Sequence, residues 1–262
     1  IAKWDGSTCL GLGGMVGSVT SLAVCDADKA LYAGGRFTSI DDVLVNHVAK
    51  WDGASWSGLG SGLSGAGEYT EAKALTVFDD GNGPGLYVSG LFAMAGEVAA
   101  NGIARWNGSA WVPLGDSSGG GSGAGARSLT AFADGTGQAL YASANDASGS
   151  GCILSKWNGS TWSAVADLEA TVTLLVSLED HGPAVLYVGG GFNAVDGLLV
   201  RHVARWQAAS WSALGSGIDR VVNSLTVFDD GNGPALYAGG LFSTSGGERA
   251  IAKWGGSSWS AL

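Results

Sequence analysis

The chain has 262 residues with 46 Gly and 11 Trp, and its formal net charge at pH 7 is −10. With 13 Lys and Arg in all, the composition excludes a nucleic-acid partner, because binding to phosphates needs clustered basic residues. No run approaches the roughly 20 apolar residues of a membrane span, and 46% hydrophobic residues argues against a disordered chain.

A strand-like segment that ends in Leu-Tyr recurs five times along the chain. In each copy except the third, a pair of small residues and then an aromatic residue follow the Leu-Tyr. The copies are residues 31–37, 86–92, 140–146, 186–192 and 236–242. Such an internal repeat decides the fold class before any single motif does.

A second marker runs between these segments: a basic residue, a Trp, a tight turn and usually a second Trp five positions after the first. The pairs are Trp51 with Trp56, Trp106 with Trp111, Trp157 with Trp162, Trp206 with Trp211, and Trp254 with Trp259, and Trp4 opens a degenerate copy with Cys9 in the second place. The first Trp residues are 47, 55, 51, 49 and 48 positions apart. This period fits a four-stranded propeller blade of roughly 40 to 50 residues.

The last copy shows how one unit is built. Residues 223–228 and 235–239 predict a hairpin around the turn residues 229–233, and residues 251–254 and 258–262 predict a second hairpin. In other units the second turn contains Asp52-Gly53, Asn107-Gly108 or Asn158-Gly159, pairs that suit type I′ turns. No sustained helical period is present, so few helices are expected.

The sequence therefore predicts an all-β fold, a β-propeller of about five four-stranded blades in a single domain over 1–262. The expected repeat units are 14–62, 63–115, 116–165, 166–215 and 216–262. Six Trp hairpins accompany five Leu-Tyr hairpins, so one hairpin is surplus at a terminus, and we assign residues 1–13 as the extra one. Either 1–13 or 251–262 would then close the ring.

Three explanations of the surplus hairpin stay open. The chain is a segment of a protein with a longer array of repeats, or the hairpin packs as a partial sixth blade, or the hairpin is donated to a neighbouring copy in a head-to-tail assembly.

The Trp residues have two interpretations. Packing between blades is favoured, because a large ring at a fixed strand position fills the wedge between neighbouring sheets. Stacking on sugar rings is the alternative. The basic residue before each first Trp is expected to form an ion pair with a repeat Asp such as Asp79 or Asp229, or to be solvated.

Cysteine and asparagine residues give weaker hypotheses. Cys9 and Cys25 replace repeat aromatics near the N-terminus, so they form either a disulfide or two small buried thiols, and Cys152 is expected to be unpaired. Asn107 and Asn158 match glycosylation acceptors, although the Asn-Gly turn explains both.

No motif for catalysis, a metal or a cofactor is found. His47 and His202 occupy one repeat position in different blades and would lie far apart. The Asp-rich turns at 79–83 and 229–233 lack the twelfth-position acid of an EF-hand loop, so a hairpin turn is preferred over calcium binding. We expect no enzyme activity and no cofactor.

The order Leu-Tyr-Val-Gly-Gly, Val-Ala-Lys-Trp-Asp-Gly and Ser-Trp-Ser-Ala-Leu resembles the kelch repeat of the galactose oxidase-like propellers over essentially the whole chain. The variant with Trp on the third strand resembles large secreted repeat proteins. The resemblance implies a propeller fold and an extracellular or cell-surface location. The Tyr, His and Cys cluster of the copper oxidases cannot be mapped onto this sequence.

Two functions follow as hypotheses. The first is a non-catalytic extracellular structural, adhesive or assembly module, with protein partners or copies of itself bound through the surplus hairpin. The alternative is a carbohydrate-binding propeller that holds a glycan on exposed aromatic rings.

Overall fold

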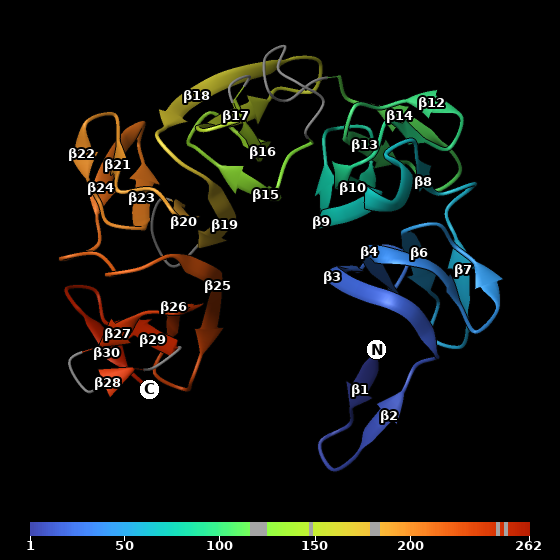
Figure 1. Cartoon of the computed structure of the whole chain (residues 1–262), viewed down its shortest axis with the longest axis horizontal. Helices are drawn as coiled ribbons and strands as arrows, with labels where there is room; N and C mark the ends of the chain where they lie inside the picture. Colours follow the sequence, from blue (N-terminus) through green and yellow to red (C-terminus); the bar gives the residue numbers. More distant parts are fainter. Residues whose placement is uncertain (116–124, 147–148, 179–183, 245–246, 249–250) are drawn as a thin grey trace. The chain divides into compact units, whose positions relative to one another are not determined.

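The computed structural model describes residues 1–115, 125–146, 149–178, 184–244, 247–248 and 251–262 (Figure 1). These residues form two compact units, which meet in the sequence between Ala126 and Arg127. Their strands are antiparallel, and the helical segment among them is a 3-10 turn, Gly67–Tyr69 (η1). No helix of the described residues is long and apolar enough to cross a membrane. The expectation of one domain over 1–262 stays a prediction.

The first unit contains a separate hairpin and two blades. The hairpin pairs β1 (Ala2–Trp4) with β2 (Cys9–Gly11) as a two-stranded sheet. Blade 1 consists of β3 (Met15–Cys25), β4 (Ala30–Ile40), β6 (Val48–Trp51) and β7 (Trp56–Gly58), with β5 (Val43–Leu44) paired to β4. Blade 2 consists of β9 (Glu71–Asp79), β10 (Pro84–Leu91), β13 (Ile103–Trp106) and β14 (Trp111–Pro113).

The second unit contains three blades of the same order. Blade 3 consists of β15 (Ser128–Ala133), β16 (Gln138–Asn145), β17 (Cys152–Trp157) and β18 (Trp162–Leu168). Blade 4 consists of β19 (Val172–Leu178), β20 (Val185–Gly190), β23 (Val203–Gln207) and β24 (Ser210–Ala213). Blade 5 consists of β25 (Val222–Asp229), β26 (Pro234–Gly240), β29 (Ile251–Trp254) and β30 (Trp259–Ala261). The all-β propeller fold with five four-stranded blades is confirmed.

Short strands form in the connections within and between blades. In the first unit β8 (Leu63–Ser64) pairs with β11 (Met94–Ala95), which also pairs with β12 (Val98–Ala99). In the second unit β21 (Ala194–Val195) joins β18 of blade 3 to β22 (Leu198–Leu199), and β27 (Ser243–Thr244) pairs with β28 (Gly247–Glu248). Residues that follow one blade therefore pair with a connection of the next blade.

The two terminal hairpins have different positions. β29 pairs with β26 over three residues, so the C-terminal hairpin completes blade 5. β1 and β2 pair only with each other. The surplus hairpin is therefore the N-terminal one, as the sequence analysis assigned it.

The turns of the Trp hairpins differ from the type I′ prediction. In blade 1 the last cross-strand pair is Trp51 with Trp56, so four residues form the loop, and of these Gly53 has a positive φ. The Asp52 carboxylate accepts hydrogen bonds from the backbone N–H groups of Ala54 and Ser55, both at 2.8 Å. Asn107 and Asn158 make the same contacts. The prediction was wrong because the Asp or Asn side chain caps a longer loop.

A two-residue turn is formed in blade 4, where no Asp-Gly or Asn-Gly pair is present. Gln207 pairs with Ser210, and the two residues between them, Ala208 and Ala209, have φ of 50° and 58°. Left-handed backbone costs a residue with a Cβ roughly 1–2 kcal/mol. This turn therefore carries strain that the four-residue loops avoid.

We expect Ala209→Gly to raise the free energy of unfolding by about 0.5 kcal/mol, because relief of left-handed strain exceeds the extra entropy of Gly in the unfolded chain. The matched control is Ala54→Gly in the blade 1 loop, where φ is negative and Gly should lower stability. Urea denaturation followed by Trp fluorescence measures both variants. Destabilisation by Ala209→Gly would contradict the proposed strain.

Candidate interaction site at the blade junctions

At two junctions between neighbouring blades, those of blades 1 and 2 and of blades 4 and 5, a Leu of one inner strand packs onto a Gly of the preceding blade. In the first unit a Cβ at Gly34 of β4 would lie 3.1 Å from Cγ of Leu75 on β9. In the second unit a Cβ at Gly189 of β20 would lie 2.8 Å from Cδ1 of Leu225 on β25. The first Gly of the small-residue pair therefore makes room for the Leu side chain of the next blade, and the second, Gly35 or Gly190, makes room for the backbone of the inner strand of its own blade.

Hydrogen bonds join the inner strands of blades 1 and 2 and of blades 3 and 4. The Leu75 backbone N–H donates to Oγ of Ser21 at 3.0 Å, and the Leu175 N–H donates to Oγ of Ser128 at 3.0 Å. These bonds cross from one blade to the next and are buried or partly buried. They fix the register in which the apolar faces meet.

The Trp pairs pack at the outer part of each junction. Within a hairpin the two rings lie 5.3 to 6.3 Å apart, centre to centre. In blade 2 the indole N–H of Trp111 donates to the carbonyl of Leu59 in blade 1 at 2.8 Å, and in blade 5 Trp259 donates to Leu214 of blade 4 at 3.2 Å. The second Trp thus links its blade to the preceding one.

Burial separates the Trp residues into two groups. Ten are buried or half-buried: Trp51, Trp56, Trp106, Trp111, Trp157, Trp162, Trp206, Trp211, Trp254 and Trp259. Trp4 on β1 is 60% exposed. In blade 4, Trp206 lies 5.7 Å from both Phe132 and Tyr141 of blade 3, so the first Trp of a hairpin covers the aromatic pair of the preceding blade.

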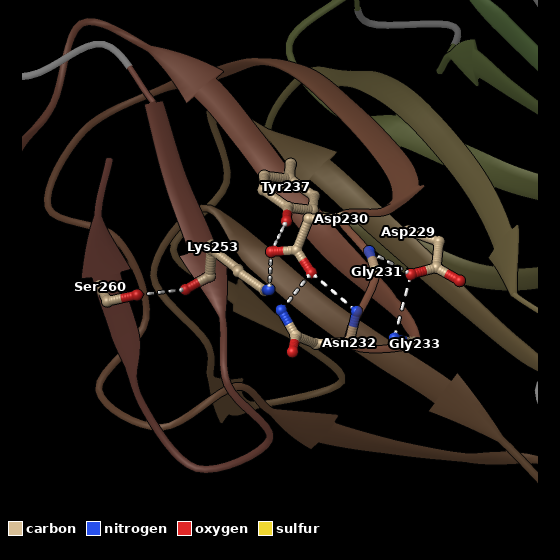
Figure 2. A network of polar contacts seen from close by, with 8 residues as sticks. All are labelled: Asp229, Asp230, Gly231, Asn232, Gly233, Tyr237, Lys253 and Ser260. Carbon is tan, nitrogen blue, oxygen red and sulfur yellow. Dashed lines mark hydrogen bonds and ion pairs between the residues drawn. The ribbon is translucent and has the colours of Figure 1, made fainter.

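A polar network ties the hairpin turn of four blades to the third strand. Figure 2 shows it in blade 5, where Oδ2 of Asp230 accepts from the Tyr237 hydroxyl at 3.0 Å and pairs with the Lys253 ammonium. In blade 1 Asp28 binds Lys50 at 2.8 Å and the Tyr32 hydroxyl at 2.7 Å. Blade 3 repeats the arrangement with Asp134, Lys156 and Tyr141.

Blade 2 has a looser version of this network. Arg105 lies 3.7 Å from Asp80, and its guanidinium donates to the Gly83 carbonyl at 2.7 Å. The guanidinium carbon lies 5.9 Å from the centre of the Tyr87 ring. The position of the corresponding turn in blade 4, residues 179–183, lies outside the described residues.

The sequence analysis named Asp79 and Asp229 as ion-pair partners of the basic residue, but the observed partners are the next residues in the chain, Asp80 and Asp230. Asp79 and Asp229 instead accept from turn N–H groups, those of Gly81 and Gly83 and of Gly231 and Gly233. These two Asp residues end a strand and cap the turn, so the following Asp faces the basic residue. The preferred interpretation of the Asp-rich segments as hairpin turns is confirmed.

The tyrosine of the network was missed, although the repeat contained its signal. Tyr32 lies directly opposite Lys50 in the sheet register, and Tyr141 lies opposite Lys156. Leu-Tyr and basic-Trp dipeptides that recur together on adjacent strands predict this cross-strand pair once the register is known.

Burial and hydrogen bonding act in opposite directions on the network carboxylates. At Asp28 burial would raise the pKa, but hydrogen bonds from Lys50 and Tyr32 outweigh it and lower the pKa to about 2. The pKa of Asp134 is held well below its usual range by bonds from Lys156, Thr136 and Tyr141 against the same burial. A lowered pKa stabilises the fold above the usual value of about 4, and the stabilisation is lost as pH falls below it.

Of the two alternatives for Cys9 and Cys25, the disulfide is not formed, and the buried thiol holds for Cys25 alone. Cys9, Cys25 and Cys152 are free, Cys9 being exposed and Cys25 buried. Cys25 packs as a small apolar residue in the cluster shared with blade 2, whereas Cys9 lies on the N-terminal hairpin at the other side of blade 1. Burial raises the pKa of Cys152 to about 11.

The remaining candidate residues have these positions. Asn107 and Asn158 are exposed in hairpin loops, where their side chains bind the loop backbone, and glycosylation stays a prediction. His47 and His202 belong to different blades and different units. Among the described residues no three or more His, Cys, Asp or Glu side chains cluster in a way that could hold a metal ion.

In each unit one blade exposes apolar residues that are buried in its neighbours. Leu22 on β3 of blade 1 is 51% exposed, whereas its counterpart Leu75 in blade 2 is 7% exposed. Phe228 on β25 of blade 5 is 58% exposed, whereas its counterpart Phe132 in blade 3 is 1% exposed. Residues of the type that joins blades elsewhere therefore lie on the surface of each unit taken by itself.

Comparison with known proteins adds little to this geometry. No protein-family model and no curated protein matches the chain. Among solved structures, the chain is similar to the WD40 beta propeller domain of Doa1, with a TM-score of 0.49 and 16% identity over 92% of this chain and 77% of that chain. This similarity is too distant to carry an argument, so the fold assignment rests on the five blades. The resemblance to kelch repeats stays a prediction.

Asp134→Asn should lower the free energy of unfolding by about 1–3 kcal/mol, because the partly buried Lys156 and Tyr141 lose a charged acceptor. The matched control is Asp230→Asn in the more exposed network of blade 5, where the loss should be smaller. Urea denaturation at pH 7 measures both. Equal losses at the two sites would show that burial does not set the strength of the network.

Proposed function

We propose that this chain is a non-catalytic structural or adhesive module that acts in assembly by binding protein through the apolar face of blade 1 that carries Leu22. The observation that carries the proposal is the exposure of Leu22, whose counterparts Leu75, Leu175 and Leu225 are all buried. An inner-strand Leu in this position packs on a Gly of the preceding blade at the junctions of blades 1 and 2 and of blades 4 and 5. The face of blade 1 that carries Leu22 thus has the chemistry of a blade junction.

The polar groups support a structural role. The Asp, Lys and Tyr side chains of blades 1, 3 and 5 bind one another, and the other strand-end Asp residues cap turns. These side chains are engaged in holding hairpins together.

A carbohydrate-binding role is supported by one observation, the exposed ring of Trp4 on the N-terminal hairpin. The ten other Trp rings are buried or half-buried between strands and blades, where a sugar could not stack on a full face. Assembly through sheet faces therefore accounts for more of the molecule than glycan binding does.

We place the module outside the cell, on the resemblance of its repeats to secreted repeat proteins. An antibody against the chain should label intact source cells or be found in their medium. Labelling that requires permeabilised cells would contradict this location.

The proposed assembly is tested with Leu22→Asp in the full chain. Size-exclusion chromatography with light scattering should show that the wild type associates as its concentration rises, and that Leu22→Asp stays monomeric because a charge on this face opposes its burial. The matched control, Leu199→Asp, changes an exposed Leu of β22 and should leave association unchanged. A wild type that is monomeric at every concentration, or that shifts its Trp fluorescence with a glycan, would overturn the proposal.

A further inference from the structure

The hairpin turn of blade 5 contains an Asn-Gly pair on the surface. Figure 2 shows the pair, Asn232-Gly233, beside the two carboxylates of the turn. The Gly233 backbone N–H donates to Oδ1 of Asp229 at 3.0 Å, and Nδ2 of Asn232 donates to Oδ1 of Asp230 at 3.0 Å. Asn232 is exposed, so water reaches its side chain. The turn therefore holds a backbone nitrogen on a carboxylate, next to a side-chain amide that is open to water.

An Asn-Gly pair brings a nucleophile and an electrophile together in the sequence. The backbone nitrogen of a residue can attack the side-chain carbonyl carbon of an Asn that precedes it, and Gly hinders this attack least because it has no Cβ. The nitrogen must lose its proton as it attacks, and a carboxylate within hydrogen-bond reach can take that proton. Asp229 holds this position on the Gly233 nitrogen. The turn thus places a general base on the nucleophile of a deamidation reaction.

We propose that Asn232 is a self-deamidation site, at which the turn of blade 5 modifies itself with water as the co-reactant. The Gly233 nitrogen bonds to Cγ of Asn232 and gives up its proton through Asp229, and the bond from Cγ to Nδ2 breaks, so that ammonia leaves with that proton. Water then opens the cyclic imide. Cleavage of the new bond at Cγ gives Asp, and cleavage at the backbone carbonyl gives isoaspartate. In both products OH replaces NH2, and no atom is oxidised or reduced.

The products disturb the network that Figure 2 shows. A carboxylate that replaces the Asn232 amide has no proton to donate to Asp230, and it repels Asp230 because two like charges then share one site. An isoaspartate also lengthens the main chain of the turn by its side-chain methylene. Asp230 binds Lys253 and Tyr237, so the modification weakens the contact between the turn and the third strand of blade 5.

The Asn-Gly pairs of the Trp hairpins are held differently. Oδ1 of Asn107 accepts from two backbone N–H groups of its own loop at 3.0 and 2.9 Å, and Asn158 makes the same contacts in blade 3. Asp52 shows what an Asp does in this position, since its carboxylate accepts the same two bonds at 2.8 Å. Conversion to Asp in these loops therefore preserves the cap, whereas at Asn232 it removes a hydrogen bond.

Blade 2 contains a second copy of the turn with an additional restraint. The Gly83 N–H donates to Oδ1 of Asp79 at 3.0 Å, as the corresponding groups do in blade 5. Here, however, the Arg105 guanidinium also donates to the carbonyls of Asn82 and Gly83, at 3.4 and 2.7 Å. Closure of the imide requires the peptide between these two residues to rotate, and the Arg105 bonds oppose that rotation. Asn82 therefore reacts more slowly than Asn232.

Incubation of the full chain at neutral pH, followed by peptide mass spectrometry over time, measures the reaction at each Asn-Gly pair. The mass increase from replacement of NH2 by OH should accumulate fastest at Asn232. Asp229→Asn keeps a hydrogen-bond acceptor for the turn but removes the base, so it should slow the reaction at Asn232 by roughly tenfold or more. Arg105→Lys, which gives blade 2 the basic residue of blade 5, should raise the rate at Asn82 toward that at Asn232. Circular dichroism checks that both variants fold.

A rate at Asn232 that is no higher than at Asn107 and Asn158 in the wild type would overturn the proposal, and this comparison needs no variant. A rate at Asn232 that is unchanged in a folded Asp229→Asn chain would overturn it as well.

The effect on the network is tested with Asn232→Asp, which carries one of the two products from the start. This variant should unfold at a lower urea concentration than the wild type. The matched control is Asn107→Asp, which should unfold at the wild-type concentration or above it, because Asp52 makes the same cap in blade 1. Equal urea midpoints for the two variants would show that the modification leaves the network intact, and would overturn the proposed consequence.

Discussion

The contact of one blade with the next is the interaction on which the rest of this structure depends. A four-stranded sheet has two faces, and in this chain each face carries residues that need a neighbour: a Leu on one side and a small residue beside an aromatic pair on the other. A Cβ at Gly189 would lie 2.8 Å from Cδ1 of Leu225, so even a methyl group at this position would require the Leu225 side chain to shift. The stability of each blade is therefore shared with its neighbours, as in other repeat proteins.

The polar networks join strands within one blade, whereas these apolar contacts join neighbouring blades. Asp28, Lys50 and Tyr32 lie on one hairpin turn and two adjacent strands, so they fix a blade internally. Blade 5 keeps the same network, through Asp230 and Lys253, although its aromatic face is open. The network of blade 5 is thus made by residues of that blade alone.

The sequence predicted what depends on the repeat and missed what depends on single side chains. Leu-Tyr and basic-Trp dipeptides predicted the strands and the five blades because strand pairing repeats with the period. The type I′ turns were wrong because the Asp52 and Asn107 side chains cap four-residue loops, a choice that a dipeptide does not reveal. The sequence left a disulfide and two buried thiols open for Cys9 and Cys25, because it does not reveal that Cys25 is buried against blade 2 while Cys9 is exposed on β2.

The outer face of an end repeat affects how a repeat protein behaves in solution. Repeat proteins generally need terminal units with a polar outer face, because an uncovered apolar face aggregates. Blade 1 has a partial cover of two short exposed strands, and blade 5 presents Phe228 without a covering Trp. The net charge of −10 opposes indiscriminate contact between copies, since like-charged surfaces repel at every approach. A contact between copies therefore needs apolar burial that outweighs this repulsion.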